Sequence, residues 1–179
     1  MDDRRRRFQA QAMPHLDAAY NLARWLTRSP TEADDIVQDA MLRAFRAFDS
    51  FRGGDVKPWL LTIVRNCHRT ALSERRRSNF VPLPETEENS AEALISSDDP
   101  ELLAIGADNA RKLGHAIAQL PHEYREVLVL REMEDMSYRD IASVTAVPIG
   151  TVMSRLARAR AALRERWLND VEGVCSELP

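Results

Sequence analysis

Hydrogen-bond donors lie along one side of the last helix that the sequence predicts, residues 151–167. Thr151, Ser154 and Arg158 fall opposite an apolar stripe, and Arg155 falls on its flank. The stripe recurs at helical spacing through Val152, Leu156, Ala159, Leu163 and Trp167. Arginine can bind guanine through two hydrogen bonds in the DNA major groove, and serine or threonine can contact bases or phosphates. A helix that is apolar inside and rich in donors outside therefore suits base recognition.

The residues before this helix decide between two interpretations of it. Taken alone, its arginines would more simply be solvated side chains of an amphipathic helix. However, Ser137-Tyr138-Arg139-Asp140 is a capping box that opens a short helix, and Pro148-Ile149-Gly150-Thr151 begins the next helix a few residues later. Two helices joined by so short a turn predict a helix-turn-helix, which the helices expected over 108–120 and 122–131 would support.

The N-terminal half predicts a helical bundle. Ser29-Pro30-Thr31-Glu32 places an N-cap serine before a proline at the first helical position, so a helix begins there. Its apolar residues form one stripe, at Ile36, Val37, Ala40, Met41, Ala44, Phe45 and Phe48. A matching stripe runs over 16–26, and a third helix is expected from Pro58 to Arg77. The predicted fold class is all-α, with two small helical domains.

The net charge of −3 hides two basic blocks. Residues 1–78 carry 15 Lys and Arg against 10 Asp and Glu, and residues 110–168 carry 10 against 7. Residues 79–109 carry 8 acids and no base, with several prolines, and residues 169–179 add 3 acids. The acidic segment is typical of a flexible linker. Either it is a solvated tether, or it imitates nucleic acid and occupies a basic channel in a partner.

Three acidic residues raise the alternative of a metal-dependent nuclease, formed by Asp34, Asp35 and Asp39 with His68. Asp35 and Asp39 share one helix face, but Asp34 is turned about 100° away from that face. No further motif supplies ligands. Carboxylates near a helix start are also common partners of the helix dipole. We therefore expect no metal, no cofactor and no enzymatic activity.

Two cysteines, Cys67 and Cys175, are far apart and form no CxxC motif. The sequence leaves open whether either has a redox role. No apolar run is long enough to span a bilayer, and no signal peptide follows Met1. The expected location is the cytoplasm.

Long stretches of the chain resemble the extracytoplasmic-function sigma factors of bacterial RNA polymerase, within the sigma-70 family. The segments 120–142 and 147–160 resemble sigma region 4. Independently, the segment 32–45, the triplet Phe51-Arg52-Gly53 and the segment 58–66 resemble sigma region 2, in the expected order. The resemblance divides the chain into a region 2 domain, a linker, a region 4 domain and a tail, at residues 1–78, 79–107, 108–168 and 169–179.

The resemblance implies roles for particular residues. In this family, region 2 docks on the clamp helices of the polymerase beta-prime subunit and opens the minus-10 element, while region 4 reads the minus-35 element and meets the beta flap. The polymerase-binding positions would be Asp34, Asp35, Gln38, Asp39 and Arg43. The minus-10 positions would be Arg52, Lys57, Arg65, Asn66 and Arg69, of which the loop 52–57 and Asn66 would capture an unstacked base. The minus-35 positions would be Thr151, Ser154, Arg155 and Arg158.

The resemblance also implies partners: RNA polymerase core, promoter DNA and an anti-sigma factor, which would provide any contact with a membrane. The linker would pass through the polymerase RNA-exit path. Three positions depart from the common pattern, namely Thr70, Met153 and Ala157, so the promoter sequence is not predictable. The rival interpretation is a conventional helix-turn-helix regulator that binds an operator without polymerase, and the N-terminal half argues against it because it resembles a polymerase-docking domain.

Overall fold

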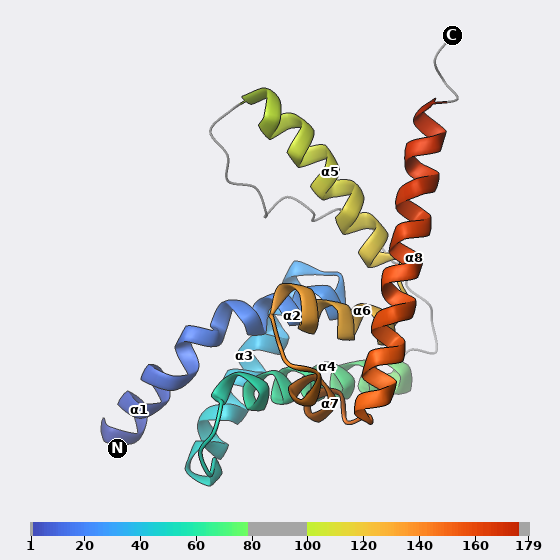
Figure 1. The fold of residues 1–179 in the computed structure, drawn as a ribbon. Helices are drawn as coiled ribbons and strands as arrows, with labels where there is room; N and C mark the ends of the chain where they lie inside the picture. The colour runs from blue at the N-terminus through green and yellow to red at the C-terminus, as the bar shows by residue number, and fades with distance from the viewer. Residues whose placement is uncertain (1, 79–99, 176–179) are drawn as a thin grey trace.

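The computed structural model describes the backbone of residues 2–78 and 100–175, and the side chains of residues 3–77 and 109–168. All regular structure within these residues is helical, which confirms the all-α class (Figure 1). The elements in chain order are α1 (Asp2–Ala12), η1 (Met13–His15), α2 (Leu16–Thr27), α3 (Pro30–Ala47), η2 (Phe48–Ser50), α4 (Val56–Ser78), α5 (Pro100–Ala118), α6 (His122–Leu128), η3 (Val129–Met133), α7 (Tyr138–Thr145) and α8 (Ile149–Cys175). None of the described helices is both long and apolar enough to cross a membrane.

The N-terminal unit is built from α2, α3 and α4, which pack against one another. The cap predicted for α3 is present, because the Ser29 hydroxyl accepts a hydrogen bond from the backbone N–H of Glu32 at 3.4 Å. The Glu32 carboxylate pairs with Arg75 of α4 at 2.6 Å. Small buried side chains let the three helices approach closely. They include Ala19, Ala23, Ala33, Ala40 and Ala44, all fully buried.

The C-terminal unit contains the predicted helix-turn-helix. Ser137 caps α7 by accepting a hydrogen bond from the backbone N–H of Asp140 at 3.1 Å. Ala146 ends α7 in the left-handed conformation, with φ of 54°, and α8 begins three residues later. Val152 and Leu156 of α8 are buried, as their place on the apolar stripe predicts. The turn is therefore short enough to hold α8 across α7 with its polar side outward.

Three helix boundaries differ from the sequence-based expectation. α5 begins at Pro100 rather than 108, because proline is well suited to the first helical position and apolar residues follow it. Most of the predicted linker, residues 79–99, lies outside the described residues. α6 ends at Leu128, and the chain continues as a short π-helical segment over Val129–Met133. The backbone of α8 continues past 167 to Cys175.

The two units pack side by side, with α4 next to α7 and α2 next to α6 (Figure 1). Most of their buried apolar residues form one core that spans both units, and Ile117, Leu120, Leu128 and Ala159 form a second, smaller cluster. Leu60 and Val64 of α4 belong to the same cluster as Leu130, Ile141 and Val144 of the C-terminal unit. Because this apolar surface would otherwise face water, its burial favours the closed placement of the units. The resemblance to a two-domain family had left this placement open.

Two histidines stack where the units meet. The rings of His68 on α4 and His122 on α6 are nearly parallel, with centroids 5.5 Å apart and an interplanar angle of 7°. Burial, reinforced by the nearby positive charges of His122 and Arg125, lowers the pKa of His68 to about 4. Burial also lowers the pKa of His122, against the opposing effect of Glu126. Near neutral pH both rings are therefore uncharged.

Acidification should destabilise the fold through this histidine pair. An unfolded chain binds the His68 proton at the ordinary pKa of about 6.5. The folded chain binds this proton only near the lowered pKa of about 4. The contribution of His68 to the free energy of unfolding is therefore fully present above about pH 6.5 and is lost as the pH falls toward 4. We expect the free energy of unfolding in urea to fall by about 2 kcal/mol between about pH 7 and about pH 4.5 because of His68.

The variant His68→Leu provides the comparison, because the buried Nδ1 of His68 has no hydrogen-bond partner among the described residues. It should show a markedly shallower loss over this pH range. His115→Gln, at an exposed position of α5, should keep the wild-type slope. Equal slopes for wild type and His68→Leu would contradict the prediction.

Candidate nucleic-acid interface

The predicted reading side of α8 faces solvent. Ser154 and Arg158 are exposed, whereas Thr151 and Arg155 are half-buried beside them. The Ser154 hydroxyl donates to the backbone carbonyl of Thr151 at 3.0 Å. A terminal nitrogen of Arg158 donates to the Tyr124 hydroxyl at 3.5 Å, which is a long contact. The four predicted minus-35 residues thus lie together on one helix, within its first three turns.

Arg160, further along α8, is engaged within the C-terminal unit. Its Nε and a terminal nitrogen both donate to one Glu132 oxygen, at 3.1 Å and 2.6 Å. This hydrogen bond raises the pKa of Arg160 above its ordinary value. Glu132 therefore holds the Arg160 guanidinium more closely than Tyr124 holds that of Arg158, so Arg158 is more readily available to a ligand.

The five predicted minus-10 residues divide into two groups. Asn66 and Arg69 are exposed on α4, and Arg52 is exposed on the loop before that helix. Lys57 and Arg65 instead contact the C-terminal unit. The structure therefore leaves only part of the predicted set exposed.

Lys57 and Arg65 each bind a buried carboxylate. Arg65 Nε lies 2.6 Å from Glu126 Oε1, and the two side chains are 11% and 2% exposed. Lys57 Nζ lies 2.9 Å from Glu134 Oε2, with exposures of 23% and 5%, and it also donates to the Glu134 backbone carbonyl at 2.7 Å. The other Glu134 carboxylate oxygen accepts from Asn21 of α2 at 3.3 Å. These contacts join the two units through charge.

The predicted polymerase-binding residues all lie on α3, away from its buried stripe. Asp34, Asp35, Gln38 and Arg43 are exposed, and Asp39 is half-buried. Arg43 binds Asp39 one turn earlier through two nitrogens, with Nε 3.1 Å from Oδ1 and a terminal nitrogen 2.9 Å from Oδ2. This hydrogen-bonded pair holds both side chains in a defined orientation.

Leu42 was missed by sequence reasoning. Its side chain is 52% exposed and lies amid the polar side of α3, between Gln38 and Arg43 in helical position. The available signal was its absence from the buried stripe, which passes through Val37, Ala40 and Ala44. Leu42 thus adds an apolar group to the exposed, otherwise polar side of α3.

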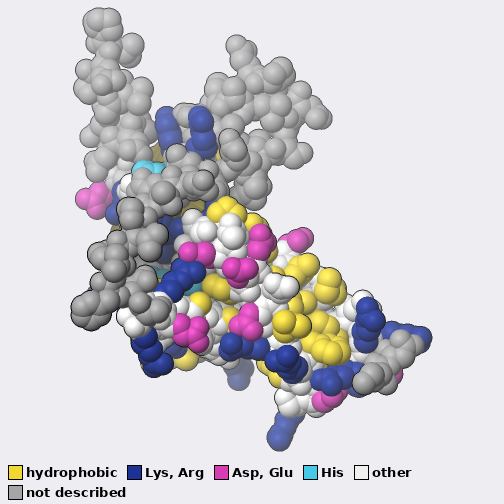
Figure 2. Space-filling view, turned by 180° about the vertical axis from the view of Figure 1, so that it is seen from behind, with side chains coloured by type: hydrophobic (Ala, Val, Ile, Leu, Met, Phe, Trp, Pro, Cys, Tyr) yellow, Lys and Arg dark blue, Asp and Glu magenta, His cyan; other side chains and the backbone are white. Residues whose placement is uncertain are grey.

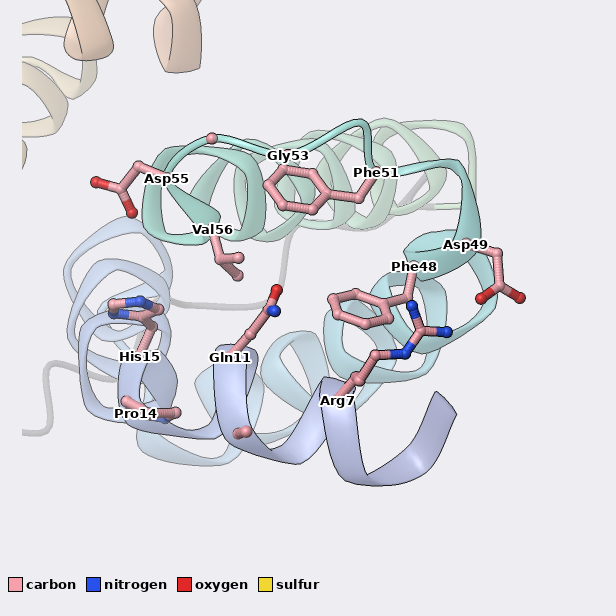
Figure 3. Close-up of a pocket in the computed structure, with 12 residues that line it drawn as sticks. Arg7, Gln11, Pro14, His15, Phe48, Asp49, Phe51, Gly53, Asp55 and Val56 are labelled. Atoms are coloured by element: carbon pink, nitrogen blue, oxygen red, sulfur yellow. The ribbon is translucent and has the colours of Figure 1, made fainter. Parts of the chain in front are cut away.

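A pocket of about 740 Å³ opens beside the predicted base-capturing loop. Figure 3 shows Gln11 extending from α1 toward the loop that carries Phe51, Gly53 and Asp55. Gly53 and Gly54 have φ values of 90° and 105°, which glycine adopts without steric cost. The lining residues are Arg7, Ala10, Gln11, Pro14, His15, Phe48, Asp49, Phe51, Gly53, Gly54, Asp55 and Val56. Sequence reasoning found the loop but missed the side contributed by α1 and η1, because only folding brings that helix alongside.

Aromatic contacts fix the base of this loop. The Phe51 and Trp59 rings lie 4.9 Å apart, and Trp59 also packs against Phe48, with centroids 6.2 Å apart. Trp59 therefore serves the packing of the loop onto α4. An aromatic anchor at the foot of the loop leaves the glycines and Asp55 as its outer part.

The charge pattern on the molecular surface is mixed. Figure 2 shows acidic and basic side chains interspersed over the middle of one face, with Lys and Arg gathering toward the end where α1 lies. Hydrophobic side chains are also visible between these areas. The basic excess of the N-terminal half is thus not displayed as one continuous patch on this face.

The residues of the nuclease alternative do not share one surface. Asp34 and Asp35 are exposed on α3, whereas His68 is buried against His122 of α6.

Cys67 is buried, and burial together with the nearby Asp39 raises the pKa of its thiol to about 11. Such a thiol stays protonated and reacts slowly. The side chain of Cys175 lies outside the described residues.

Comparison with known families accounts for both units. Residues 12–78 match the family model of sigma-70 region 2, and residues 110–163 match that of sigma-70 region 4. Over 137 residues, the chain is 36% identical to the ECF RNA polymerase sigma-E factor of Escherichia coli strain K12, an alignment that covers 74% of this chain and 72% of that protein. The chain belongs to the extracytoplasmic-function sigma factors of the sigma-70 family.

Two further similarities agree with this assignment. The chain is 31% identical over 153 residues to the ECF sigma factor SigE of Mycolicibacterium smegmatis, which covers 84% of this chain and 58% of that longer protein. The sigma factor RpoE of Bartonella quintana, solved in complex with the anti-sigma factor NepR, has a TM-score of 0.70 and 28% identity, covering 89% of this chain and 96% of that one. Sigma factors are not an enzyme class. The matches favour this family over a conventional operator-binding regulator.

Proposed function

We propose that this sigma factor directs RNA polymerase core to promoters that carry a minus-10 and a minus-35 element, and that its residues divide this work as the sequence predicts. The observation that carries the proposal is the presence of regions 2 and 4 on one chain, each with its predicted contact residues mostly at the surface. One region alone would supply either polymerase docking or duplex recognition. Both together provide a means to place polymerase at a chosen site.

The α3 surface is the proposed polymerase contact. It combines the Asp39–Arg43 pair, exposed carboxylates at Asp34 and Asp35, and the exposed apolar side chain of Leu42. Charged residues around an apolar centre are the usual arrangement of a protein interface. By family resemblance the partner is the pair of clamp helices of the beta-prime subunit, while region 4 meets the beta flap.

The loop and pocket before α4 are the proposed site for an unstacked base of the minus-10 element. The pocket offers an aromatic side chain, Phe51, and polar groups on Gln11 and Arg7. A base removed from the stack is held by stacking and by hydrogen bonds to its edge, and this offsets a cost of a few kcal/mol. Asn66 and Arg69, exposed on α4, would contact the strand beyond the pocket.

The first turns of α8 are the proposed minus-35 reader. Arg158 and Arg155 supply donors that fit guanine, and Thr151 and Ser154 fit bases or phosphates. Met153, 53% exposed next to Ser154, adds an apolar group to this side. Because a methionine stands among these donors, we expect α8 to recognise a different base sequence from a helix that presents arginines alone.

The remaining parts of the proposal follow from family membership. Sigma factors of this type work inside the cytoplasm, where polymerase and the chromosome are, and we expect no catalytic activity from this chain. We also expect control by an anti-sigma factor, because the similar sigma factor RpoE of Bartonella quintana forms a complex with the anti-sigma factor NepR. Any membrane contact would be made by that partner. The acidic linker would follow the RNA-exit path of polymerase.

Transcription in vitro tests the function. Purified bacterial core polymerase is incubated with a fragmented genomic library, with and without this protein, and RNA start sites are mapped. We expect new start sites that share two spaced upstream elements. Absence of new starts, together with specific duplex footprints by the protein alone, would instead establish the operator-binding regulator.

Replacing Asn66 should impair promoter opening while leaving polymerase binding intact. Asn66→Ala removes an exposed amide from α4, so the hydrogen bonds to the displaced strand are lost and the fold is not disturbed. On a natural promoter we expect about a tenfold loss of transcription, which is on the order of one to two hydrogen bonds. A pre-melted promoter should recover most of the activity.

Thr70→Ala is the matched control for Asn66→Ala, since Thr70 is exposed one turn later and its hydroxyl donates to the Asn66 backbone carbonyl at 2.9 Å. It should open the natural promoter at nearly the wild-type rate. If Asn66→Ala transcribed both promoters at wild-type levels, the proposed role of Asn66 would be wrong.

Replacing Arg158 should weaken recognition of the minus-35 element. Arg158→Ala removes a guanidinium from the exposed side of α8, which costs about 1–3 kcal/mol if it binds a guanine through two hydrogen bonds. The measurement is the affinity of holoenzyme for duplex promoters in which each minus-35 base pair is varied in turn. Arg158→Ala should become indifferent to one position, whereas Arg164→Ala, exposed further along α8, should keep the wild-type preference at every position.

A further inference from the structure

Two exposed apolar side chains lie beside the hydrogen-bond donors of α8. Ile149 is 46% exposed and Met153 is 53% exposed, and they stand about one turn apart at the start of the helix. Neither packs against either apolar core of the described residues. Ala157, about one turn further along, is also exposed. Ile149, Met153 and Ala157 together form an apolar row on the surface of α8.

The apolar row runs alongside the predicted minus-35 donors. In helical position, Met153 falls between the buried Leu156 and the exposed Ser154, so the row borders Ser154 and Arg158 on one flank. A helix with its side chains is about 10–12 Å wide, and the major groove of DNA is about 12 Å wide. A helix that presents Ser154 and Arg158 to base edges therefore also brings its flank against the neighbouring bases.

The surface between the apolar row and the donors is open. Gly150 lies between Met153 and Ser154 in helical position. Apart from its two neighbours in the chain, no side chain of the described residues lies within 4 Å of the place that a Cβ at Gly150 would take. On the other side of the row, Arg160 is held by Glu132 at 2.6 Å. A large ligand can thus cover Met153 from the same direction as Ser154 without displacing that ion pair.

Thymine is the base whose chemistry matches the apolar row. In the major groove every base presents hydrogen-bonding groups, but thymine also presents its C5-methyl group. A polar base edge placed against Met153 would lose its water without gaining a partner, which is unfavourable. A methyl group placed there leaves water together with the methionine side chain, which is favourable. The donors beside the row favour DNA over a protein as the occupant, because a protein would need acceptors for Ser154 and Arg158 as well as an apolar surface.

We propose that Met153 and Ile149 determine specificity by contacting thymine methyl groups in the minus-35 element, next to the base that Arg158 contacts. The inference rests on the proposed function, because it takes α8 as the minus-35 reader. Residues four apart are separated by about 6 Å along a helix. This is close to two base-pair steps of about 3.4 Å each. We therefore expect the two thymines to lie within about two base pairs of each other.

Replacing thymine by uracil tests the proposal, because uracil keeps the hydrogen-bonding groups of thymine and lacks only its methyl group. Duplexes are recovered from a random library by polymerase holoenzyme and, in parallel, by the full-length protein alone. Each thymine of the recovered minus-35 element is then replaced by uracil, one position on one strand at a time, and the affinity is measured. We expect binding to weaken about fourfold at one or two positions, which is the effect of losing one buried methyl-sized group.

Variants of the protein assign each responsive thymine to a side chain. Met153→Ala should bind the thymine and uracil duplexes equally at one position, and Ile149→Ala should do so at the other. Met153→Leu should keep the wild-type response, since leucine is also large and apolar. Leu168→Ala is the matched control, because Leu168 is 53% exposed like Met153 and lies near the far end of the described side chains of α8. Leu168→Ala should keep the fourfold response at every position, and urea unfolding establishes that each variant is folded.

Two results would overturn the inference: a wild-type affinity that uracil changes at no position, and a response that persists at full size at every position in both Met153→Ala and Ile149→Ala. The proposed function fails in a different way. If the protein alone selects duplexes with a methyl-dependent affinity but yields no new start sites with core polymerase, the thymine contact stands and the sigma function does not. New start sites without any response to uracil leave the sigma function standing and remove the thymine contact.

Discussion

Packing of α4 against the C-terminal unit determines how the two units are placed and which charges meet between them. Leu60 and Val64 of α4 enter the same core as Ile141 and Val144 of α7, so the two units share one apolar interior. Each unit alone would expose that surface to water. The charged pair Arg65–Glu126 lies at the edge of this interior, where burial of the carboxylate requires its partner. Placement of the units and pairing of the charges are therefore coupled.

This coupling gives α4 two uses. The side that carries Leu60 and Val64 is committed to packing, whereas Asn66 and Arg69 on another side remain exposed. Arg65 lies between these sides and contacts Glu126 of the C-terminal unit. One helix thus has an apolar side, an exposed polar side and a charged edge between them that joins the two units.

The surfaces on α3 and α8 are less sensitive to this contact. Their exposed residues are set by the buried stripes on the opposite sides of the same helices, and these stripes pack within their own units. The Asp39–Arg43 pair is formed one turn apart within a single helix, so it needs no distant partner. Packing of the two units consequently covers part of α4 but leaves α3 and the first turns of α8 at the surface.

Features that arise from neighbouring residues along the chain were predictable from the sequence. The caps at Ser29 and Ser137, the buried stripes and the helix-turn-helix are all local, since capping and helical periodicity act over a few residues. The pairing of Arg65 and Lys57 with Glu126 and Glu134, which are at least 61 residues away along the chain, became visible only in the folded protein. No spacing rule predicts such pairs. They arise because burying a shared apolar surface brings distant segments together, and charges at its edge must then find partners.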